Sequence, residues 1–556
     1  MKIAICCFNS KYIHSSLAPW YLKAGIEKYC ENGHECEIIE STVNADISDA
    51  TDKICRIKLE LIGFCSYIWN IERVLETAKT VREKLPDCRI LLGGPEVSYR
   101  AKALLEQYGF LDFIISGDGE EPLARLADAL HKGGEISDIE GLCYRSGEEI
   151  VESQPHISVK TPPNPYSDEY FSCLQNRICY IDASRGCPFS CAFCLSGRCG
   201  GVRYFGMEEV KKNILRLSCS GSKTVKFIDR TFNSNEKRAN EIIKFISENY
   251  GKAIPRGVCF HFEIAGDILK ESTLKLLNAC PKGAVQLEIG MQSFNEETLK
   301  KIHRKTDTAK LISNIEKLRK PRNIHIHIDL IAGLTGEDME SFRRSFNIGY
   351  GLRADMLQMG FLKLLYGADM RENPEEYPCS FGYAPPYEVK ETPWLSADEI
   401  LSLKKTEDAL DRLYNSGRFT ETLAYLTDEC GIEPFSLFFD FGNFLKAENM
   451  PLKKYIEAVY GYFSKFSFVD RKILRDKMVS DRLRSNSSAD IPDCLKIPDR
   501  RLKLLKKHFS KENLKVGVAI LYSENTVIAV EYKNRDAVTG RYEPLKYDLD
   551  SIMNLC

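Results

Sequence analysis

Three cysteines lie close together on one short segment of the sequence. The segment reads Ser184-Arg-Gly-Cys187-Pro-Phe-Ser-Cys191-Ala-Phe-Cys194, a CxxxCxxC pattern that directly follows a predicted strand. Three thiolates on one loop can hold three irons of a [4Fe–4S] cube and leave the fourth iron without a protein ligand. An open metal position is what a reactive site needs, because a substrate can bind there. The sequence therefore predicts a reactive iron–sulfur cluster on Cys187, Cys191 and Cys194.

Two other interpretations of the same cysteines stay open at this point. They could be core cysteines, or they could form a zinc knuckle with Cys199 as the fourth ligand. A zinc knuckle usually needs paired CxxC units or a fourth protein ligand, so it fits the spacing less well.

Composition limits the kind of protein that carries this loop. The chain has 556 residues, 21 cysteines and a net charge of −2. Such a charge gives no global positive field for a nucleic-acid backbone, so we expect no strong nucleic-acid signal. The N-terminal stretch reads as a strand without a cleavage site, and no apolar run is long enough to span a bilayer. We therefore expect a cytoplasmic protein with free thiols and no membrane partner.

The first segment alternates short apolar runs with amphipathic helical patterns, which indicates a doubly wound parallel sheet of the Rossmann type. Such sheets bind ligands at the carboxyl ends of their strands, at the point where the strand order reverses. A hairpin and a Pro-rich connector follow this region. The predicted strands are Lys2–Phe8, Cys36–Ser41, Leu61–Tyr67, Arg89–Gly93 and Phe113–Ser116, and the predicted hairpin is Gly141–Glu152.

The second segment repeats the alternation, and six β/α units predict a partial (β/α)6 barrel with its chemistry at the carboxyl ends of the strands. The remainder is mostly helical and charged, and it ends in a strand pair. We expect three domains, at residues 1–155, 156–372 and 373–556. The predicted barrel strands are Cys179–Ser184, Val225–Asp229, Cys259–Ile264, Val285–Met291, Ile324–Ala332 and Met356–Leu362.

The cysteine loop, with the aromatic Phe193 before its third cysteine, resembles that of the radical SAM family. Motifs similar to those of the family follow at the later strand ends, in the family's order. The resemblance implies that the cluster binds S-adenosylmethionine (SAM) and that these motifs hold it. Asp229 would meet the methionine amino group, and Arg304 the carboxylate. The other implied SAM contacts are Glu263, Glu288, Gln292, Ser293, Gly333 and Leu334.

The N-terminal segment is similar to the cobalamin-binding (B12-binding) domain that is fused to one class of radical SAM enzymes. The similarity rests on Gly93-Gly-Pro-Glu96, on Gly117-Asp-Gly-Glu120 and on the segment from Cys65 to Asn70. Glycines at these strand ends allow close approach to a bulky ligand. The implied cobalamin contacts are Ser66, Tyr67, Trp69, Asn70, Gly93, Gly94, Pro95, Glu96, Gly117, Gly119 and Glu120.

One motif of many cobalamin proteins is absent: the sequence has no D-x-H-x-x-G segment to supply a histidine to cobalt. His14 lies after the first strand, but the resemblance gives no precedent for it as a ligand. We therefore expect cobalamin in the base-off form, with His14 uncoordinated.

The resemblance implies an enzyme that cleaves SAM to a 5′-deoxyadenosyl radical, with a flavodoxin- or ferredoxin-type electron donor. Methyl transfer to an unactivated carbon is the first hypothesis. Rearrangement, cyclisation or sulfur insertion without methyl transfer is the second, and a non-catalytic cobalamin or metal sensor is an alternative of another class. The substrate stays open, since a peptide, a natural product, a lipid and RNA are not distinguished.

Overall fold

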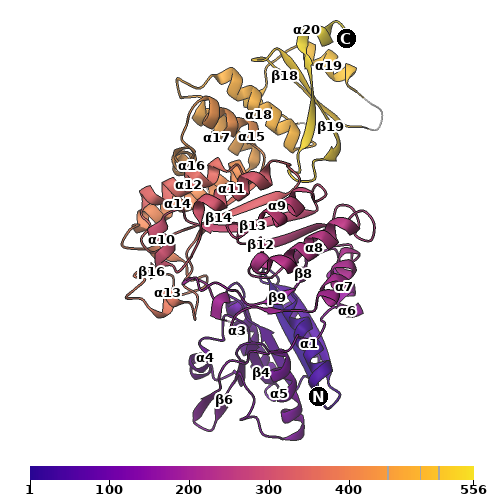
Figure 1. The fold of residues 1–556 in the computed structure, drawn as a ribbon, viewed down its shortest axis with the longest axis vertical. Helices are drawn as coiled ribbons and strands as arrows, with labels where there is room; N and C mark the ends of the chain where they lie inside the picture. Colours follow the sequence, from indigo (N-terminus) through magenta and orange to yellow (C-terminus); the bar gives the residue numbers. More distant parts are fainter. Residues whose placement is uncertain (199, 447–449, 489, 511–513, 556) are drawn as a thin grey trace. The chain divides into compact units, whose positions relative to one another are not determined.

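The structure is a computed structural model that describes residues 1–556 except 199, 447–449, 489, 511–513 and 556. The chain forms two compact units, and their elements are labelled in Figure 1. The first unit contains Met1–Val285, Lys300–Thr306 and Leu362–Lys390. The second contains Gln286–Leu299, Asp307–Phe361 and Glu391–Cys556.

The first unit begins with a sheet in the order β2-β1-β3-β4-β5-β6-β7. The strands from β1 to β5 pair in parallel, and β6 and β7 extend the edge as an antiparallel hairpin. The strand order reverses between β1 and β3, which marks the expected ligand edge. The strands are β1 Lys2–Asn9, β2 Glu35–Thr42, β3 Leu61–Cys65, β4 Arg89–Gly93, β5 Phe113–Ile115, β6 Leu142–Ser146 and β7 Glu149–Glu152.

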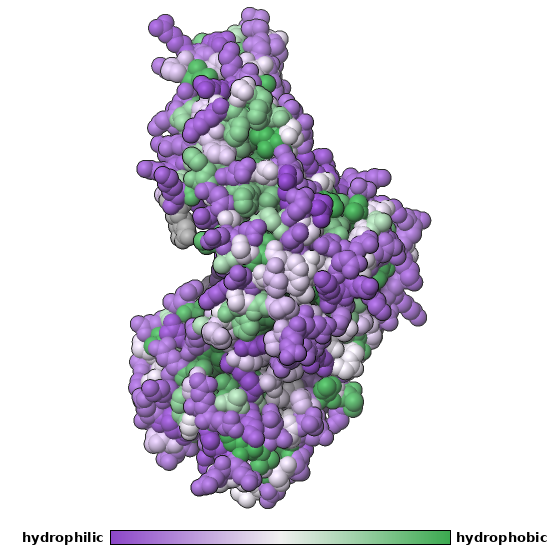
Figure 2. Space-filling model, turned by 90° about the vertical axis from the view of Figure 1, so that its left-hand side faces the viewer, coloured by the Kyte–Doolittle hydropathy of each residue, from purple (hydrophilic) through white to green (hydrophobic). Residues whose placement is uncertain are grey.

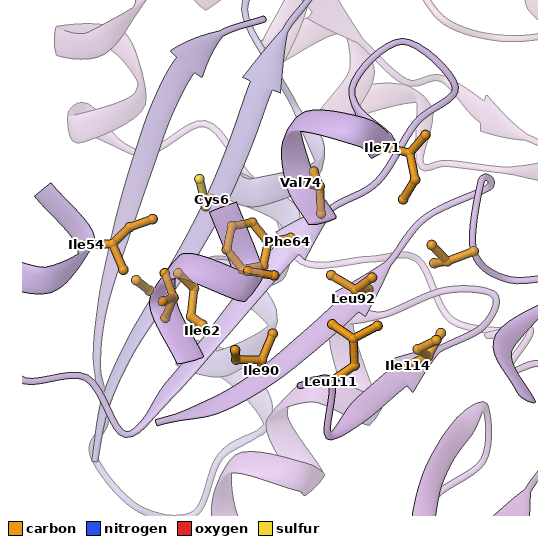
Figure 3. Close-up of a cluster of buried hydrophobic side chains, with 14 of the residues drawn as sticks. Cys6, Ile54, Ile62, Phe64, Ile71, Val74, Ile90, Leu92, Leu111 and Ile114 are labelled. Atoms are coloured by element: carbon orange, nitrogen blue, oxygen red, sulfur yellow. The ribbon is translucent and has the colours of Figure 1, made fainter. Parts of the chain in front are cut away.

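Helices cover both faces of this sheet, because its central strands carry apolar side chains on both sides. One core includes Ile54, Phe64 and Val74 and lies under α2, α3 and α4 (Figure 3). The other core includes Ile5 and Leu126 and lies under α1 and α5. The expected doubly wound domain is confirmed. The helices are α1 Ala18–Tyr29, α2 Ile47–Arg56, α3 Ile71–Lys84, α4 Ala101–Gln107 and α5 Glu120–Lys132.

The first unit continues into three parallel strands in the order β8-β11-β12. A helix precedes or follows each strand, as in a β/α barrel. The elements are α6 Asp168–Leu174, β8 Cys179–Ile181, β9 Ser184–Arg185, β10 Arg203–Tyr204, α7 Met207–Ser218, β11 Thr224–Phe227, α8 Glu236–Asn249, β12 Cys259–Ile264 and α9 Glu271–Asn278. The unit also includes α13 Asp369–Glu372 and β16 Ser380–Phe381.

The second unit contains the remaining parallel strands, in the order β13-β14-β15. Burial alternates along β13, because successive side chains of a strand point to opposite faces. The six β/α repeats of a partial barrel are thus present. The elements are β13 Val285–Gln292, α10 Glu296–Lys301, α11 Thr308–Arg319, β14 His325–Ala332, α12 Met339–Gly351 and β15 Met356–Phe361.

The rest of the second unit is helical and ends in an antiparallel sheet in the order β18-β19-β20. The sequence predicted only the first two of these strands. The third, β20, contains Pro544 and several charged residues. Such residues are uncommon in strands, so the sequence did not predict this one. The elements are α14 Ala397–Leu410, α15 Thr420–Ala424, α16 Pro434–Phe444, α17 Leu452–Phe463, α18 Arg471–Ser485, α19 Arg501–His508, β18 Val516–Leu521, β19 Thr526–Arg535, β20 Tyr542–Asp548 and α20 Leu549–Met553.

Among the residues that the structure describes, none of the helices combines the length and the apolar character that crossing a membrane requires. On the face drawn in Figure 2, hydrophilic residues cover most of the surface, and apolar residues form scattered patches.

Candidate cofactor site

The cysteine loop begins directly after β9 and is fixed in the middle by backbone hydrogen bonds. The N–H of Ala192 donates to the carbonyl of Ile302 at 3.0 Å, and the carbonyl of Ala192 accepts from the N–H of Met370 at 3.0 Å. Both partners belong to segments of the first unit. The loop conformation is therefore set by the chain around it.

Each of the three sulfur atoms has a polar neighbour. Cys187 Sγ lies 3.3 Å from Thr231 Oγ1, and Cys194 Sγ accepts from the N–H of Ser196 at 3.4 Å. Polar neighbours of this kind orient the side chains that they contact.

Cys191 receives a cationic donor, because Arg304 Nη1 lies 3.6 Å from its Sγ. Burial raises the pKa of Cys191, the Arg304 charge opposes this, and the charges of Cys194 and Cys187 raise the pKa further. A bound metal cluster would relieve the repulsion between the three thiolates. The donor set thus fits an iron–sulfur cluster. The sequence analysis predicted that Arg304 contacts the SAM carboxylate. In the structure, its Nη1 lies beside the sulfur of Cys191.

Gly186, before the first cysteine, has a structural reason to be glycine. Its φ is +93°, and a Cβ there would lie 1.9 Å from the carbonyl oxygen of Gly201. Phe193 is half-buried within the loop. Cys199, the alternative zinc ligand, lies outside the described residues.

Asp229 lies just past β11 and joins it to the entrance of the cysteine loop. Its Oδ2 accepts from the N–H of Ala183 at 2.9 Å, and its Oδ1 accepts from Ser184 Oγ at 2.5 Å. Burial raises the pKa of this carboxyl group to about 7, and these hydrogen bonds oppose the rise. Asp229 therefore fixes the chain at Ala183 and Ser184, just before the cysteine loop.

A cavity of about 670 Å³ opens at the carboxyl ends of the first sheet. It lies at the reversal between β1 and β3, where a doubly wound sheet binds its ligand. Its walls include the expected contacts Tyr67, Trp69, Gly93, Gly94, Pro95, Gly117, Gly119 and Glu120, together with residues before the cysteine loop, namely Tyr180, Asp182, Ser184, Arg185 and Gly186.

Two of the cavity glycines are required by the chain itself. Gly94 has a φ of +117°, and a Cβ there would lie 2.5 Å from the carbonyl oxygen of Ser66. Gly117 has a φ of +91°, and a Cβ would lie 2.1 Å from the carbonyl oxygen of His156. The sequence attributed these glycines to ligand approach alone, whereas backbone crossings at the strand ends already require them.

Three expected cobalamin contacts do not line the cavity. Ser66 and Asn70 are buried, and Asn70 caps the turn after β3 by accepting from the N–H of Tyr67 at 2.8 Å. Glu96 accepts from Arg100 at 2.5 Å and from the hydroxyl of Tyr387 at 2.6 Å. These three side chains therefore stabilise the loops that form the cavity walls and do not line the cavity themselves.

The aromatic pair at the end of β3 does reach the cavity. The rings of Tyr67 and Trp69 stack with centroids 4.4 Å apart and an interplanar angle of 5°. Trp69 is 51% exposed, so its ring offers a flat apolar surface at the cavity wall.

Arg185 is the functional residue that the sequence missed. Its guanidinium pairs with Asp118 at 3.1 Å, Glu120 at 2.7 Å and Asp182 at 3.3 Å. The side chain also stacks on Tyr21 at 4.6 Å. Arg185 therefore ties β9, directly before the cysteine loop, to Asp118 and Glu120 of the Gly117–Glu120 segment. The only sequence signal was its place two residues before Cys187.

His14 also lines the cavity. Its Nδ1 lies 2.6 Å from the hydroxyl oxygen of Tyr180. Burial and the charges of Lys11 and Lys226 lower its pKa below the usual 6.5, so the ring is neutral at neutral pH.

The remaining expected SAM contacts lie on the barrel strands. In the first unit, Glu263 on β12 pairs with Lys226 at 3.4 Å. In the second unit, donor atoms of Glu288, His327 and Asp329 lie within 4.8 Å of one another. Gln292 closes β13 with a φ of +69°.

Two expected contacts of the second unit have their side chains inside the protein. Ser293 is 1% exposed and donates to Glu337 Oε1 at 2.5 Å. Leu334 is fully buried, while the preceding Gly333 has a φ of +86°. At Ser293 and Leu334, only the backbone is left to face a ligand.

Family models match three parts of the chain. The B12 binding domain matches residues 4–127, the Radical SAM superfamily matches residues 181–347, and a protein family of unknown function, DUF4080, matches residues 375–539. Residues 181–347 are therefore a radical SAM domain, and a B12 binding domain precedes it in the chain. The expected resemblance to radical SAM enzymes with a cobalamin-binding domain is confirmed. These domains imply a [4Fe–4S] cluster, SAM and cobalamin as cofactors.

Curated relatives and solved structures agree with this class. The chain is 25% identical to the hopanoid C-3 methylase of Methylococcus capsulatus over 57% of its own length. It is 23% identical to the anaerobic magnesium-protoporphyrin IX monomethyl ester cyclase of Rubrivivax gelatinosus over 60% of its length. The chain covers 61% of each relative. The structure of OxsB, a cobalamin-dependent SAM radical enzyme with aqua-cobalamin bound, matches with a TM-score of 0.62 and 14% identity over 91% of this chain and 83% of that one.

Proposed function

We propose that this protein is a cobalamin-dependent radical SAM methyltransferase that methylates an unactivated carbon of its substrate. One observation carries the proposal: Arg185 lines the cavity at the sheet reversal and lies two residues before Cys187. A cofactor in that cavity and a cluster on that loop would be neighbours within one compact unit.

The roles of individual residues follow from their positions. Cys187, Cys191 and Cys194 would hold the cluster, and Arg304 would keep a positive charge beside Cys191. When bound, the cluster and SAM would supply a radical, and cobalamin would supply a methyl group. The expected SAM contacts at Asp229, Glu263, Glu288 and Gln292 remain part of the proposal.

The cavity walls would bind the corrin and keep water away from it. The apolar side chains of Leu17, Leu22 and Ile115 lie at the wall, and the stacked Tyr67–Trp69 pair adds a flat surface. Exclusion of water protects a reactive centre from side reactions. This is the contribution that we assign to the sheet domain.

A second function has support of its own. The cyclase of Rubrivivax gelatinosus is among the curated relatives, and it covers about as much of this chain as the hopanoid methylase does. Ring closure, rearrangement or sulfur insertion would use the same cluster and cavity without net methyl transfer. We keep it as the alternative.

The test is anaerobic reconstitution with iron, sulfide and cobalamin, followed by a SAM assay with a strong reductant. Methyl transfer predicts 5′-deoxyadenosine and S-adenosylhomocysteine together. 5′-Deoxyadenosine alone supports the alternative. A protein that binds both cofactors and forms neither product would be a sensor, and the enzyme proposal would be rejected.

We also propose the division into domains at residues 1–155, 156–372 and 373–556, and a flavodoxin- or ferredoxin-type electron donor.

A further inference from the structure

Three metal-binding side chains lie together at the amino-terminal edge of the first sheet, opposite the strand ends that form the cavity. Cys30 directly follows α1, His34 precedes β2, and Asp128 lies near the end of α5. One donor atom from each lies within 4.8 Å of the other two. This group shares no residue with the cysteine loop or the cavity.

The group is partly shielded from water. The side chain of His34 is 0% exposed and that of Asp128 is 14% exposed. The ring of His131, one turn further along α5, packs edge-on against His34 with centroids 5.5 Å apart. A cation here would be held in a partly closed site.

The distances suit one small cation. His34 Nε2 lies 3.0 Å from Asp128 Oδ1. Two ligand atoms of a tetrahedral zinc lie about 3.3 Å apart, given bonds of about 2.0–2.1 Å. Cys30 Sγ lies 3.4 Å from the carbonyl oxygen of Ala124, one turn before Asp128 on the same helix. The sulfur is therefore above the turn that presents the carboxylate.

The carboxylate is held in place by its neighbours. Asp128 Oδ2 accepts from the N–H of Glu31 at 2.7 Å, and Oδ1 accepts from Asn32 Nδ2 at 2.7 Å. Hydrogen bonds of this kind orient a ligating carboxylate and its metal.

The same three residue types could instead form a nucleophilic cysteine site, but the electrostatics oppose that. Burial and the Asp128 charge raise the pKa of Cys30 to about 11. A nucleophilic cysteine needs a lowered pKa, because the thiolate is the reactive form. A bound cation would compensate both effects.

We propose that Cys30, His34 and Asp128 bind one Zn²⁺, with water in the fourth position. Thiolate, imidazole and carboxylate together favour zinc over magnesium or calcium, which prefer oxygen ligands. Binding forms a zinc–sulfur bond and releases the Cys30 proton to solvent. The metal would fasten the connection between α1 and β2 to α5, and thereby the base of the sheet domain.

The test is the zinc content of the reconstituted full-length protein, measured by mass spectrometry after removal of loose metal with a mild chelator. We expect about one zinc per chain in the wild type, and at least a tenfold loss in each of Cys30→Ser, His34→Asn and Asp128→Asn. Iron content should stay unchanged in all three. The same loss is expected in a Cys187→Ala/Cys191→Ala/Cys194→Ala background, where free cluster thiols cannot bind zinc.

Two controls match the chemistry. Cys55→Ser removes another half-buried thiol of the sheet domain. His156→Asn removes a histidine whose Nδ1 pairs with Glu140 at 3.0 Å. Among the described residues, this pair is not part of a group of three potential metal ligands. Both variants should keep the zinc.

A folding readout separates metal loss from unfolding. Added zinc should raise the Tm of the metal-free wild type by about 5 °C, and it should leave folded His34→Asn unchanged. Absence of zinc from the wild type, or zinc retained by Cys30→Ser, would overturn the proposal.

Discussion

Arg185 Nη2 donates to Glu120 Oε1 at 2.7 Å, and this contact joins β9, directly before the cysteine loop, to the first residue of α5. The Arg185 side chain is 20% exposed, and it also pairs with Asp118 and Asp182. Removal of the guanidinium would take a cation away from Glu120 and Asp182, while Asp118 would keep Arg203 at 2.5 Å. The pair therefore couples the proposed cluster site to the proposed cobalamin site.

We predict that Arg185→Gln lowers the free energy of unfolding by about 3–5 kcal/mol and weakens both cobalamin uptake and iron retention. The reason is that buried carboxylates lose their partner. Urea unfolding, corrin absorbance and iron analysis measure the three effects. Arg198→Gln is the control, because Arg198 forms a more exposed pair with Asp369 in the same region and should cost at most about 1 kcal/mol. If Arg185→Gln kept normal cobalamin uptake, the coupling would be refuted.

We predict that replacement of Cys187, Cys191 or Cys194 by alanine abolishes the visible absorbance of the cluster. Each thiolate would hold one iron, and two thiolates do not hold the cube. Cys219→Ala, which removes an exposed cysteine, should leave the spectrum unchanged. Zinc in place of iron in the wild-type loop would reject the radical interpretation.

We predict that Gly117→Ala prevents cobalamin uptake. The new Cβ would lie 2.1 Å from the carbonyl oxygen of His156 at a φ of +91°, so the loop must move, at a cost of about 2–4 kcal/mol. Corrin absorbance after purification with excess hydroxocobalamin is the measurement. Gly133→Ala is matched for backbone strain, since φ is +66°, but its Cβ meets nothing within 4 Å. Equal uptake by both variants would contradict the assignment of the cavity.

We predict base-off cobalamin with His14 uncoordinated. The reason is that the sequence has no D-x-H-x-x-G motif to supply a histidine to cobalt. Paramagnetic resonance of the cob(II)alamin state should show no histidine nitrogen splitting, and His14→Ala should leave the spectrum unchanged. A splitting that disappeared in His14→Ala would overturn this prediction.

We predict that Glu337 makes stability depend on pH. Burial raises its pKa to about 7, and the hydroxyls of Ser293 and Ser345 oppose the rise. A raised pKa means that the neutral acid is the favoured folded form. Its contribution is fully present below the unfolded pKa of about 4.3 and is lost as pH rises to about 7, with a slope of up to about 1.4 kcal/mol per pH unit.

Glu337→Gln should remove that part of the pH dependence, because the amide stays neutral at every pH. Urea unfolding between pH 5 and pH 8 measures it, with Glu340→Gln as the control, since that side chain is 60% exposed. An unchanged slope in Glu337→Gln would show that Glu337 does not titrate as described.

The sequence predicted the sheet domain and the barrel strands well, because both depend on local patterns. β4 and β12 have the predicted limits, and the other predicted strands of these two regions differ from the structure by a few residues at most, whereas the two-residue β10 was not predicted. The three cysteines of the proposed cluster lie within eight residues of chain, so their spacing is visible in the sequence alone. Short-range spacing is a property that a sequence displays directly.

The contacts of single side chains were harder to predict, because they depend on residues far away in the chain. Arg185 meets Asp118 across 67 positions, and Ser293 meets Glu337 across 44. No local pattern announces such pairs. The sequence could therefore name Ser293 and Glu96 as ligand contacts without showing that other side chains already engage them.

The two backbone hydrogen bonds at Ala192 have a consequence for how the metal site is built. Because Ile302 and Met370 hold the loop between them, backbone hydrogen bonds order the middle of this segment in addition to any metal. Cluster assembly then requires little further loss of chain entropy, which is often the main free-energy cost when a flexible segment forms a metal site. If oxygen destroyed the cluster, these backbone hydrogen bonds would still hold the loop. We therefore expect that the same polypeptide could be reloaded with iron and sulfide instead of being replaced.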